Sequence, residues 1–290
     1  MSMKARRCLE KSSEHAGDAS YLSASPASLP AASEKYRFLP TLHVLFYLCL
    51  CLFMARVCED VIPLTMRPVP FVRLADGGVV RDPSLNYPVL PNEELYNLKV
   101  LGMRLGIISP IWFIIITGSS VFREKGGKSW KVHTALSSYL VGMGCTEFLT
   151  DFLKLTVGRL RPNFYALCSW SDVVQSCAAG EMERAARKSF PSGHASNTFC
   201  AMTVIALFLG VEVTRLTRTI HASNGHASNV TSPPLALLHI AAALSPILAA
   251  SYMSAGRIAT CWHHDSDVLA GAVIGLSCGK FAWGLFHKDR

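Results

Sequence analysis

Apolar stretches recur along the chain, and each is nearly long enough to cross a bilayer as one helix. A bilayer-spanning helix needs about 20 mostly apolar residues. Half of the 290 residues are hydrophobic and only 17% are charged, whereas about a quarter of the residues of soluble domains are charged. We therefore predict an all-α integral membrane protein built as a six-helix bundle. The six spans are predicted at residues 41–57, 105–118 with their flanks, 132–153, 195–213, 235–255 and 268–286.

The basic residues indicate how these spans are oriented. The net charge of +8 does not favour nucleic-acid binding, because the Lys and Arg residues lie at the ends of the spans and form no single long arm. Cytoplasmic connections of membrane proteins are enriched in Lys and Arg. This rule places both termini in the cytoplasm and the connections after the first, third and fifth spans on the extracellular or lumenal side. The connection after the third span is also basic, so its charges need another role.

The segments outside the spans are polar. Residues 1–39 are rich in Ser and Ala, and we predict a disordered cytoplasmic tail there, followed by a membrane domain over residues 40–290. An oxidising compartment can join Cys168 to Cys177, and the sequence leaves this pairing open. Long outward loops are predicted at residues 58–98 and 163–187.

Three polar clusters lie at the ends of predicted spans. They read KLTVGRLRP at 154–162, KSFPSGHASN at 188–197 and GRIATCWHHDSD at 256–267. Because successive spans alternate in direction, all three clusters fall on the non-cytoplasmic side of the membrane. We expect them to form one site.

The clusters contain groups that suit an anion. Lys154, Arg161 and Arg257 are fixed positive charges, and the planar guanidinium of Arg matches phosphate oxygens. Ser192 and Gly193 precede a helix, whose start offers free N–H groups to an anion; Gly193 also allows close approach to the backbone. Each feature also has a simpler explanation, since Lys and Arg at span ends extend to lipid headgroups and Ser192 suits a helix cap.

Two histidines and a carboxylate complete the candidate site. His263 and Asp267 are spaced i, i+4, so on a helix they lie on one face and can form a hydrogen bond. A carboxylate at one ring nitrogen leaves the other nitrogen available as a nucleophile or base. His194 can supply a proton, because the pKa of histidine is about 6.5. His and Asp are also metal ligands, but the neighbouring Lys and Arg side chains would repel a metal cation and attract phosphate.

Other charged residues near the clusters receive simpler assignments. Glu147 and Asp151 lie within the third span and should face the bundle interior, where each would form a hydrogen bond or an ion pair. His264 is assigned a structural role. Four basic residues either widen a positive surface that attracts anions or are solvated, and we favour solvation: Arg159, Arg184, Arg187 and Lys188.

Taken together, the motifs resemble those of the type 2 phosphatidic acid phosphatase superfamily, and the lipid phosphate phosphatase branch looks closest. K-x6-RP runs from Lys154 to Pro162, PSGH occupies 191–194, and R-x5-H-x3-D begins at Arg257. The third motif usually begins with Ser-Arg. This chain has Gly256 before the arginine, which removes one hydroxyl contact to phosphate.

The resemblance implies a role for each matched residue. His263 would attack phosphorus and become a phosphohistidine, with Asp267 orienting its ring. His194 would protonate the leaving alcohol and then help to activate water. No metal cofactor is implied, so the reaction would not depend on magnesium. The phosphoryl oxygens would be held by Lys154, Arg161, Ser192, Gly193 and Arg257.

The sequence thus predicts a multi-pass membrane phosphatase with its active site at the non-cytoplasmic ends of the helices. The substrate would be a lipid phosphate monoester such as phosphatidate, lysophosphatidate or a sphingoid-base phosphate, or diacylglycerol pyrophosphate. One alternative is hydrolysis of a polyprenyl diphosphate or sugar phosphate on the same fold, and another is a catalytically silent transporter or scaffold. The expected partners are the lipid substrate and the bilayer, with no nucleic acid. The choice of membrane, the lipid preference and the oligomeric state, homo-oligomers included, are left open.

Overall fold

The computed structural model describes residues 56–89, 129–178, 180–223 and 233–287, together with residues 46, 49, 50 and 53. The chain divides into the units Met1–Leu39 and Pro40–Arg290, and all the described residues belong to the second. The predicted tail and the second predicted span therefore lie outside the described residues, as does most of the first span.

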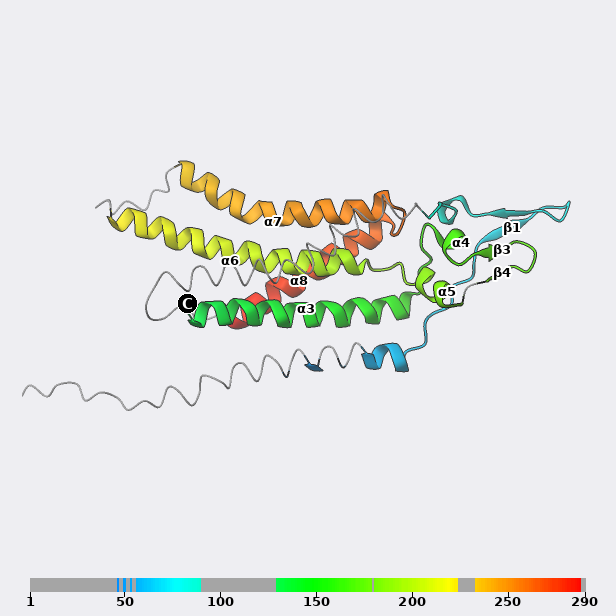
Figure 1. Cartoon of the computed structure of the whole chain (residues 1–290), viewed down its shortest axis with the longest axis horizontal. Helices are drawn as coiled ribbons and strands as arrows, with labels where there is room; N and C mark the ends of the chain where they lie inside the picture. The colour runs from blue at the N-terminus through cyan, green and yellow to red at the C-terminus, as the bar shows by residue number, and fades with distance from the viewer. Residues whose placement is uncertain are drawn as a thin grey trace, which may run out of the picture. The chain divides into compact units, whose positions relative to one another are not determined.

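In the part of the chain that the structure describes, four long helices run alongside one another (Figure 1). Helix α6 contacts both α7 and α8, and α3 contacts α6 and α8. They correspond to the third to sixth predicted spans. Each is a few residues longer than its apolar stretch at either end, except that α6 continues to Ser223, well past its predicted end at residue 213. Thr217 and Thr219 fit this extension because their hydroxyls bond to carbonyl oxygens four residues earlier. The four helices are α3 (Ser129–Val157), α6 (Gly193–Ser223), α7 (Pro233–Ala259) and α8 (Asp265–His287).

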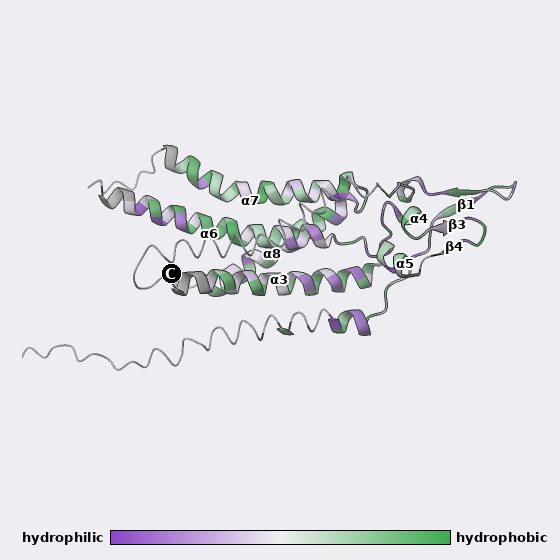
Figure 2. Cartoon of the chain, in the orientation of Figure 1, coloured by the Kyte–Doolittle hydropathy of each residue, from purple (hydrophilic) through white to green (hydrophobic). Residues whose placement is uncertain are grey.

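Three of the described helices are long and apolar enough to cross a membrane, over Gly193–Thr219, Ala236–Ala259 and Asp265–His287. Hydrophobic residues predominate along α7 (Figure 2), and several of its large aliphatic side chains are exposed, among them Leu237 and Leu248. Exposed apolar side chains on a long helix suit contact with lipid. Helix α3 has 29 residues but carries more polar side chains, so the total of six spans stays a prediction.

A row of glycines allows α8 to pack closely on α6. A Cβ atom on Gly271 would lie 2.5 Å from the carbonyl oxygen of Ser192, and one on Gly275 would lie 2.2 Å from that of Ser196. Gly279 approaches the carbonyl of Cys200 in the same way. Small residues at intervals of four let two membrane helices come together at their backbones. This packing fixes the start of α6 against the start of α8.

Short elements gather at one end of the long helices (Figure 1). The structure is mostly helical, and it departs from the all-α prediction by two antiparallel hairpins in the predicted loops. In the pairing of the strands, Phe71 lies opposite Arg81 and Trp170 lies opposite Cys177. The elements are β1 (Phe71–Arg73), β2 (Val79–Arg81), the 3-10 helix η1 (Pro83–Leu85), α4 (Phe164–Leu167), β3 (Trp170–Ser171), β4 (Ser176–Cys177) and α5 (Gly180–Ala186).

These short elements share a small core of their own. Phe164, Tyr165 and Trp170 are buried against one another. A disulfide joins Cys168 to Cys177, which answers the question that the sequence left open. The two hairpins are also linked through charged and polar side chains, including an ion pair between Arg81 and Asp172 at 2.8 Å.

The C-terminal end of α3 is held by residues that come much earlier in the chain. Gly158 follows the helix with a φ of +57°, and a Cβ atom there would lie 1.9 Å from the carbonyl oxygen of Thr65. Only glycine combines this left-handed conformation with so close an approach. The backbone N–H of Thr65 donates to Leu155, and its hydroxyl donates to Thr156. The loop that follows α3 therefore leaves the helix in a defined direction.

Candidate active site

The three polar clusters meet where α3 ends, where α6 begins and where α7 connects to α8. The backbone N–H of Ser192 donates to the carbonyl of Asp267 at 2.9 Å, which ties the second cluster to the third. The first cluster pairs with the segment before α6, since Arg161 N–H donates to Ala186 at 2.9 Å and Ser189 N–H donates to Arg159 at 3.0 Å. Residues far apart in the sequence thus line one small region.

The side chain of Arg161 is fixed by three carbonyl acceptors, two from the stretch before α6 and one from the connection between α7 and α8. Its Nε atom donates to the carbonyl of Ala185 at 2.9 Å, and its terminal nitrogens lie 3.4 Å from the carbonyls of Trp262 and Lys188. The guanidinium also lies over the Trp262 ring, 4.9 Å from its centroid. Burial lowers the pKa of Arg161 to about 10, against the opposing charge of Asp267. The group therefore remains positively charged at neutral pH.

The start of α6 faces the end of α3. A Cβ atom on Gly193 would lie 3.0 Å from Nζ of Lys154, so the ammonium group lies directly against the Gly193 backbone. Lys154 also pairs with Asp151 at 2.9 Å. Ser192 is fully buried, and its hydroxyl accepts from Ala195 N–H at 3.4 Å, as a helix cap does. A lysine, a hydroxyl and free helix N–H groups therefore share one corner.

Two further predicted residues lie near this corner. Arg257, in the last turn of α7, is 7% exposed. In the part of the chain that the structure describes, its side chain makes no hydrogen bond or ion pair. His194, in the first turn of α6, is exposed. The positive charges of Arg257, Arg161 and Lys154 act on the His194 ring. The arrangement leaves positive charge available beside an accessible imidazole.

His263 lies in the connection between α7 and α8, and its ring is held by a backbone carbonyl. The Nδ1 atom is 2.7 Å from the carbonyl oxygen of Ser189. A carbonyl only accepts, so Nδ1 carries the proton and the neutral ring has its free lone pair on Nε2. The residue is 4% exposed, and burial lowers the pKa of His263, against the opposing effects of Asp267 and the Ser189 carbonyl. A neutral imidazole with a free Nε2 is a competent nucleophile.

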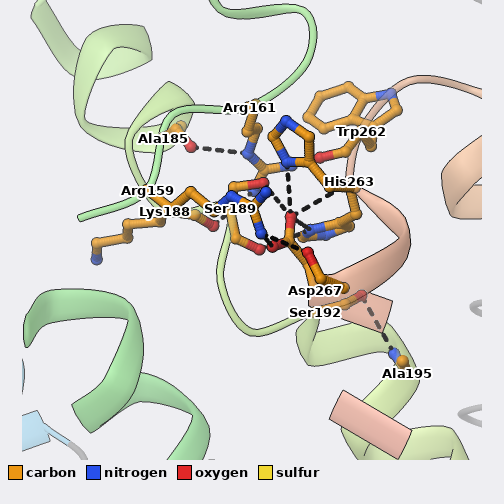
Figure 3. Close-up of polar contacts among 12 residues, drawn as sticks. Arg159, Arg161, Ala185, Lys188, Ser189, Ser192, Ala195, Trp262, His263 and Asp267 are labelled. Atoms are coloured by element: carbon orange, nitrogen blue, oxygen red, sulfur yellow. Dashed lines mark hydrogen bonds and ion pairs between the residues drawn. The ribbon is translucent and has the colours of Figure 1, made fainter. Parts of the chain in front are cut away.

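Asp267 does not form the hydrogen bond expected with His263, because its Oδ2 atom lies 3.8 Å from Nδ1 of the ring. The i, i+4 spacing would bring the two together on a helix, but α8 begins only at Asp265. Asp267 is fully buried, and its oxygens instead accept from Arg159 Nη1 at 2.6 Å, the Ser189 hydroxyl at 2.6 Å, and the backbone N–H and Nδ1 of His264 at 2.9 and 3.1 Å. Figure 3 shows Arg159, Ser189 and His263 gathered around this carboxylate.

Two residues of this site were not predicted from the sequence. Arg159 was predicted to be solvated, but it pairs with the buried Asp267 and also donates to the hydroxyl of Ser266 at 2.6 Å. Ser189 belongs to the second cluster but was assigned no role. Its place in the second cluster gave no indication that it contacts Asp267 and His263. His264 was assigned a structural role, and its two bonds to Asp267 are consistent with that.

The remaining basic residues are engaged with the outer elements. Arg187 was also predicted to be solvated, but it is 5% exposed, pairs with Glu183 at 2.8 Å and lies over the Phe164 ring. Lys188 pairs with Glu59, and Arg184 is exposed but donates to the Glu59 carbonyl at 3.4 Å.

The carboxylates of α3 behave as predicted. Glu147 accepts from Nδ2 of Asn197 on α6 at 2.8 Å, and Asp151 forms its ion pair with Lys154. Both carboxylates are thereby satisfied within the bundle.

A cleft of about 460 Å³ opens beside His263. Its lining includes Ser84 and Tyr87, from the segment after β2, together with Cys261, Asp265 and Ser266. Among the described residues, no three His, Cys, Asp or Glu side chains are grouped so that they could hold a metal ion.

Comparison with known proteins identifies the family to which the chain belongs. The family model described as the PAP2 superfamily matches residues 135–290. Lipid phosphate phosphatase 1 of Arabidopsis thaliana is 28% identical over 230 residues, which cover 76% of this chain and 62% of that protein. Phospholipid phosphatase 1 of Rattus norvegicus is 29% identical over 236 residues, covering 73% of this chain and 74% of the relative. No solved structure matches significantly. The chain belongs to the PAP2 superfamily, in its lipid phosphate phosphatase branch.

Proposed function

We propose that this protein is a membrane phosphatase that hydrolyses lipid phosphate monoesters through a phosphohistidine on His263. The observation that carries the proposal is the hydrogen bond from His263 Nδ1 to the Ser189 carbonyl at 2.7 Å, close to the Arg161 guanidinium, which donates to the carbonyl of Trp262. It leaves the Nε2 lone pair free to attack phosphorus, and the cations would hold the phosphoryl oxygens.

In the first step, Nε2 of His263 forms a bond to phosphorus while the bond to the lipid oxygen breaks. Charge develops on the phosphoryl oxygens, and Lys154, Arg161 and Arg257 would stabilise it together with the Ser192 hydroxyl and the Gly193 N–H. His194, when protonated, would give its proton to the leaving alkoxide. The buried negative charge of Asp267 lies 3.8 Å from the His263 ring and would stabilise the positive charge that the ring acquires.

In the second step, water replaces the histidine. His194, now neutral, would take a proton from the attacking water as the new oxygen–phosphorus bond forms and the nitrogen–phosphorus bond breaks. The products are inorganic phosphate and the free His263 imidazole. Since the stabilising charges all belong to side chains of the protein, we propose that the reaction requires no metal.

The substrate would keep its tails in the bilayer and present its phosphate at the non-cytoplasmic surface. The disulfide between Cys168 and Cys177 supports this orientation, because disulfides persist in extracellular and lumenal compartments. Candidate substrates are phosphatidate, lysophosphatidate, sphingoid-base phosphates and diacylglycerol pyrophosphate. Both termini would then be cytoplasmic.

Phosphate release by the purified protein tests this function. The protein in detergent micelles, with excess chelator, should release phosphate from at least one lipid phosphate monoester, and vanadate should inhibit the reaction. Polyprenyl diphosphates and sugar phosphates, assayed in parallel, test the alternative substrates. His263→Ala should abolish release. His239→Ala is the matched control, because His239 lies on α7 roughly 27 Å from Arg257 by helical rise. No release from any substrate by the wild-type protein would favour a silent transporter or scaffold.

A further inference from the structure

We propose that Ser189 is a positioning residue that couples Asp267 to the nucleophile. The inference rests on the proposed role of His263. The hydroxyl of Ser189 donates to Oδ2 of Asp267 at 2.6 Å, and its carbonyl accepts from Nδ1 of His263 at 2.7 Å. One residue therefore contacts both the carboxylate and the ring.

All three polar groups of Ser189 are used, and each reaches a different part of the site. Its backbone N–H donates to the carbonyl of Arg159 at 3.0 Å, which ties it to the loop after α3. The residue is fully buried, so water does not compete for these bonds. A buried network in which every member is satisfied holds one geometry. Ser189 thus holds its carbonyl in a fixed direction toward the His263 ring.

The direct contact between Asp267 and His263 does not provide this orientation. At 3.8 Å the pair lies beyond hydrogen-bond distance, although the charges still interact. The carboxylate oxygens are already engaged by Arg159, by His264 and by the Ser189 hydroxyl. Asp267 therefore orients the ring through Ser189, and its own charge acts on the ring at longer range.

This arrangement predicts how substitutions at the two residues combine. Ser189→Ala removes the hydroxyl and keeps the carbonyl. The hydrogen bond to Asp267 is lost, so it no longer holds the carbonyl in its direction toward His263. The Michaelis constant should change less than twofold, because Ser189 does not touch the substrate. The turnover number should fall about 10- to 100-fold, as expected for a lost hydrogen bond to a charged group. If Ser189 acts through Asp267, adding Ser189→Ala to Asp267→Asn should cost less than about threefold more.

The experiment measures turnover number and Michaelis constant for wild type, both single variants and the double variant of the full chain in detergent. Ser138→Ala is the matched control, because Ser138 is also fully buried and its hydroxyl donates to a backbone carbonyl on α3; its turnover should stay within about twofold of wild type. Should Ser189→Ala fail to fold, Ser189→Cys decides, since the thiol occupies the space that alanine leaves open and is only a weak donor. Its turnover should fall at least about fivefold.

Three results would overturn the inference. One is wild-type turnover in Ser189→Ala, or in Ser189→Cys where that variant decides. Another is a loss in the double variant equal to the product of the two single losses. The third is a loss in Ser138→Ala as large as that in Ser189→Ala, which would show only a general cost of removing a buried hydroxyl. If the wild-type protein turns over and forms phosphohistidine in any of these cases, only the role of Ser189 fails. If wild type releases no phosphate, both proposals fail.

Discussion

Arg159 and Asp267 form an ion pair in which Nη1 lies 2.6 Å from Oδ1, and the carboxylate is fully buried while the arginine side chain is 30% exposed. Removing the arginine leaves a buried charge with one donor fewer, which is costly. We expect Arg159→Met to lower the free energy of unfolding by about 1–3 kcal/mol and to reduce turnover. Thermal unfolding in detergent and steady-state kinetics check both.

Arg184→Met is the control for the loss of a positive charge, because Arg184 is exposed on α5 and makes only a long hydrogen bond, of 3.4 Å, to the Glu59 carbonyl. It should leave stability and turnover nearly unchanged. If Arg159→Met also left stability and turnover unchanged, the ion pair with Asp267 would contribute neither to the stability of the protein nor to its activity.

The close packing of α8 on α6 makes Gly275 sensitive to the addition of one carbon atom. Its Cβ atom would lie 2.2 Å from the carbonyl of Ser196, and backbone atoms of this kind cannot move aside cheaply. Gly275→Ala should therefore destabilise the protein by about 1–3 kcal/mol. Gly284→Ala is the matched control on the same helix, since a Cβ atom there would meet no packing neighbour within 4 Å among the described residues. It should be neutral or slightly stabilising. Equal melting temperatures for the two variants would contradict the packing.

A substitution at Gly193 tests whether phosphate binds at the corner formed by Lys154, Ser192 and the start of α6. Its Cβ atom would meet the end of a flexible side chain, Nζ of Lys154 at 3.0 Å, so the protein should fold with little loss of stability. The added methyl group would displace the ammonium group and fill the space of a phosphoryl oxygen. We expect Gly193→Ala to reduce kcat/KM at least about tenfold. A variant with wild-type kcat/KM would show that phosphate does not approach this backbone.

The pH dependence should reflect the buried state of His263. Burial lowers the pKa of His263, so the ring stays neutral below its ordinary value of about 6.5 and becomes protonated only at more acidic pH. Activity should therefore persist at the ordinary pKa of histidine and fall only at more acidic pH, where His263 becomes protonated. Asp267 opposes the effect of burial by raising the pKa of His263. Asp267→Asn should then move the acid limb of kcat/KM to lower pH while reducing the maximum.

Wild type and Asp267→Asn are measured on the same substrate. The titration of the lipid phosphate is common to both, so it does not contribute to the difference between their pH profiles. An acid limb that moves to higher pH in Asp267→Asn would mean that another group controls it.

Much of the helical framework could be predicted from the sequence. Runs of apolar residues located α3, α7 and α8 within a few residues, and they located the start of α6 but not its end at Ser223. They do so because a helix in a bilayer presents apolar side chains to lipid or to its neighbours over most of its length. The two hairpins could not be predicted in this way. Strands of two or three residues, such as Ser176–Cys177, are too short to show a repeating pattern.

The composition of the candidate site was partly predictable. Alternation of spans brought the three motifs to one end of the bundle, and spacing identified His263 and Asp267 as neighbours. The partner of His263 is a backbone carbonyl, which has no signature in a sequence. The burial of Arg159 against Asp267 likewise depends on how the loop after α3 meets the start of α8. The local sequence at a span end does not distinguish a buried arginine from a solvated one.

The covalent intermediate is the most direct test of the proposed mechanism. Wild-type protein is mixed with lipid labelled in its phosphate group and quenched with alkali within one turnover. We predict a protein-bound phosphoryl group, stable in alkali and labile in acid, that maps to His263 by peptide analysis and is missing in His263→Ala. Rapid phosphate release without any such adduct, or an adduct that persists in His263→Ala, would contradict the mechanism.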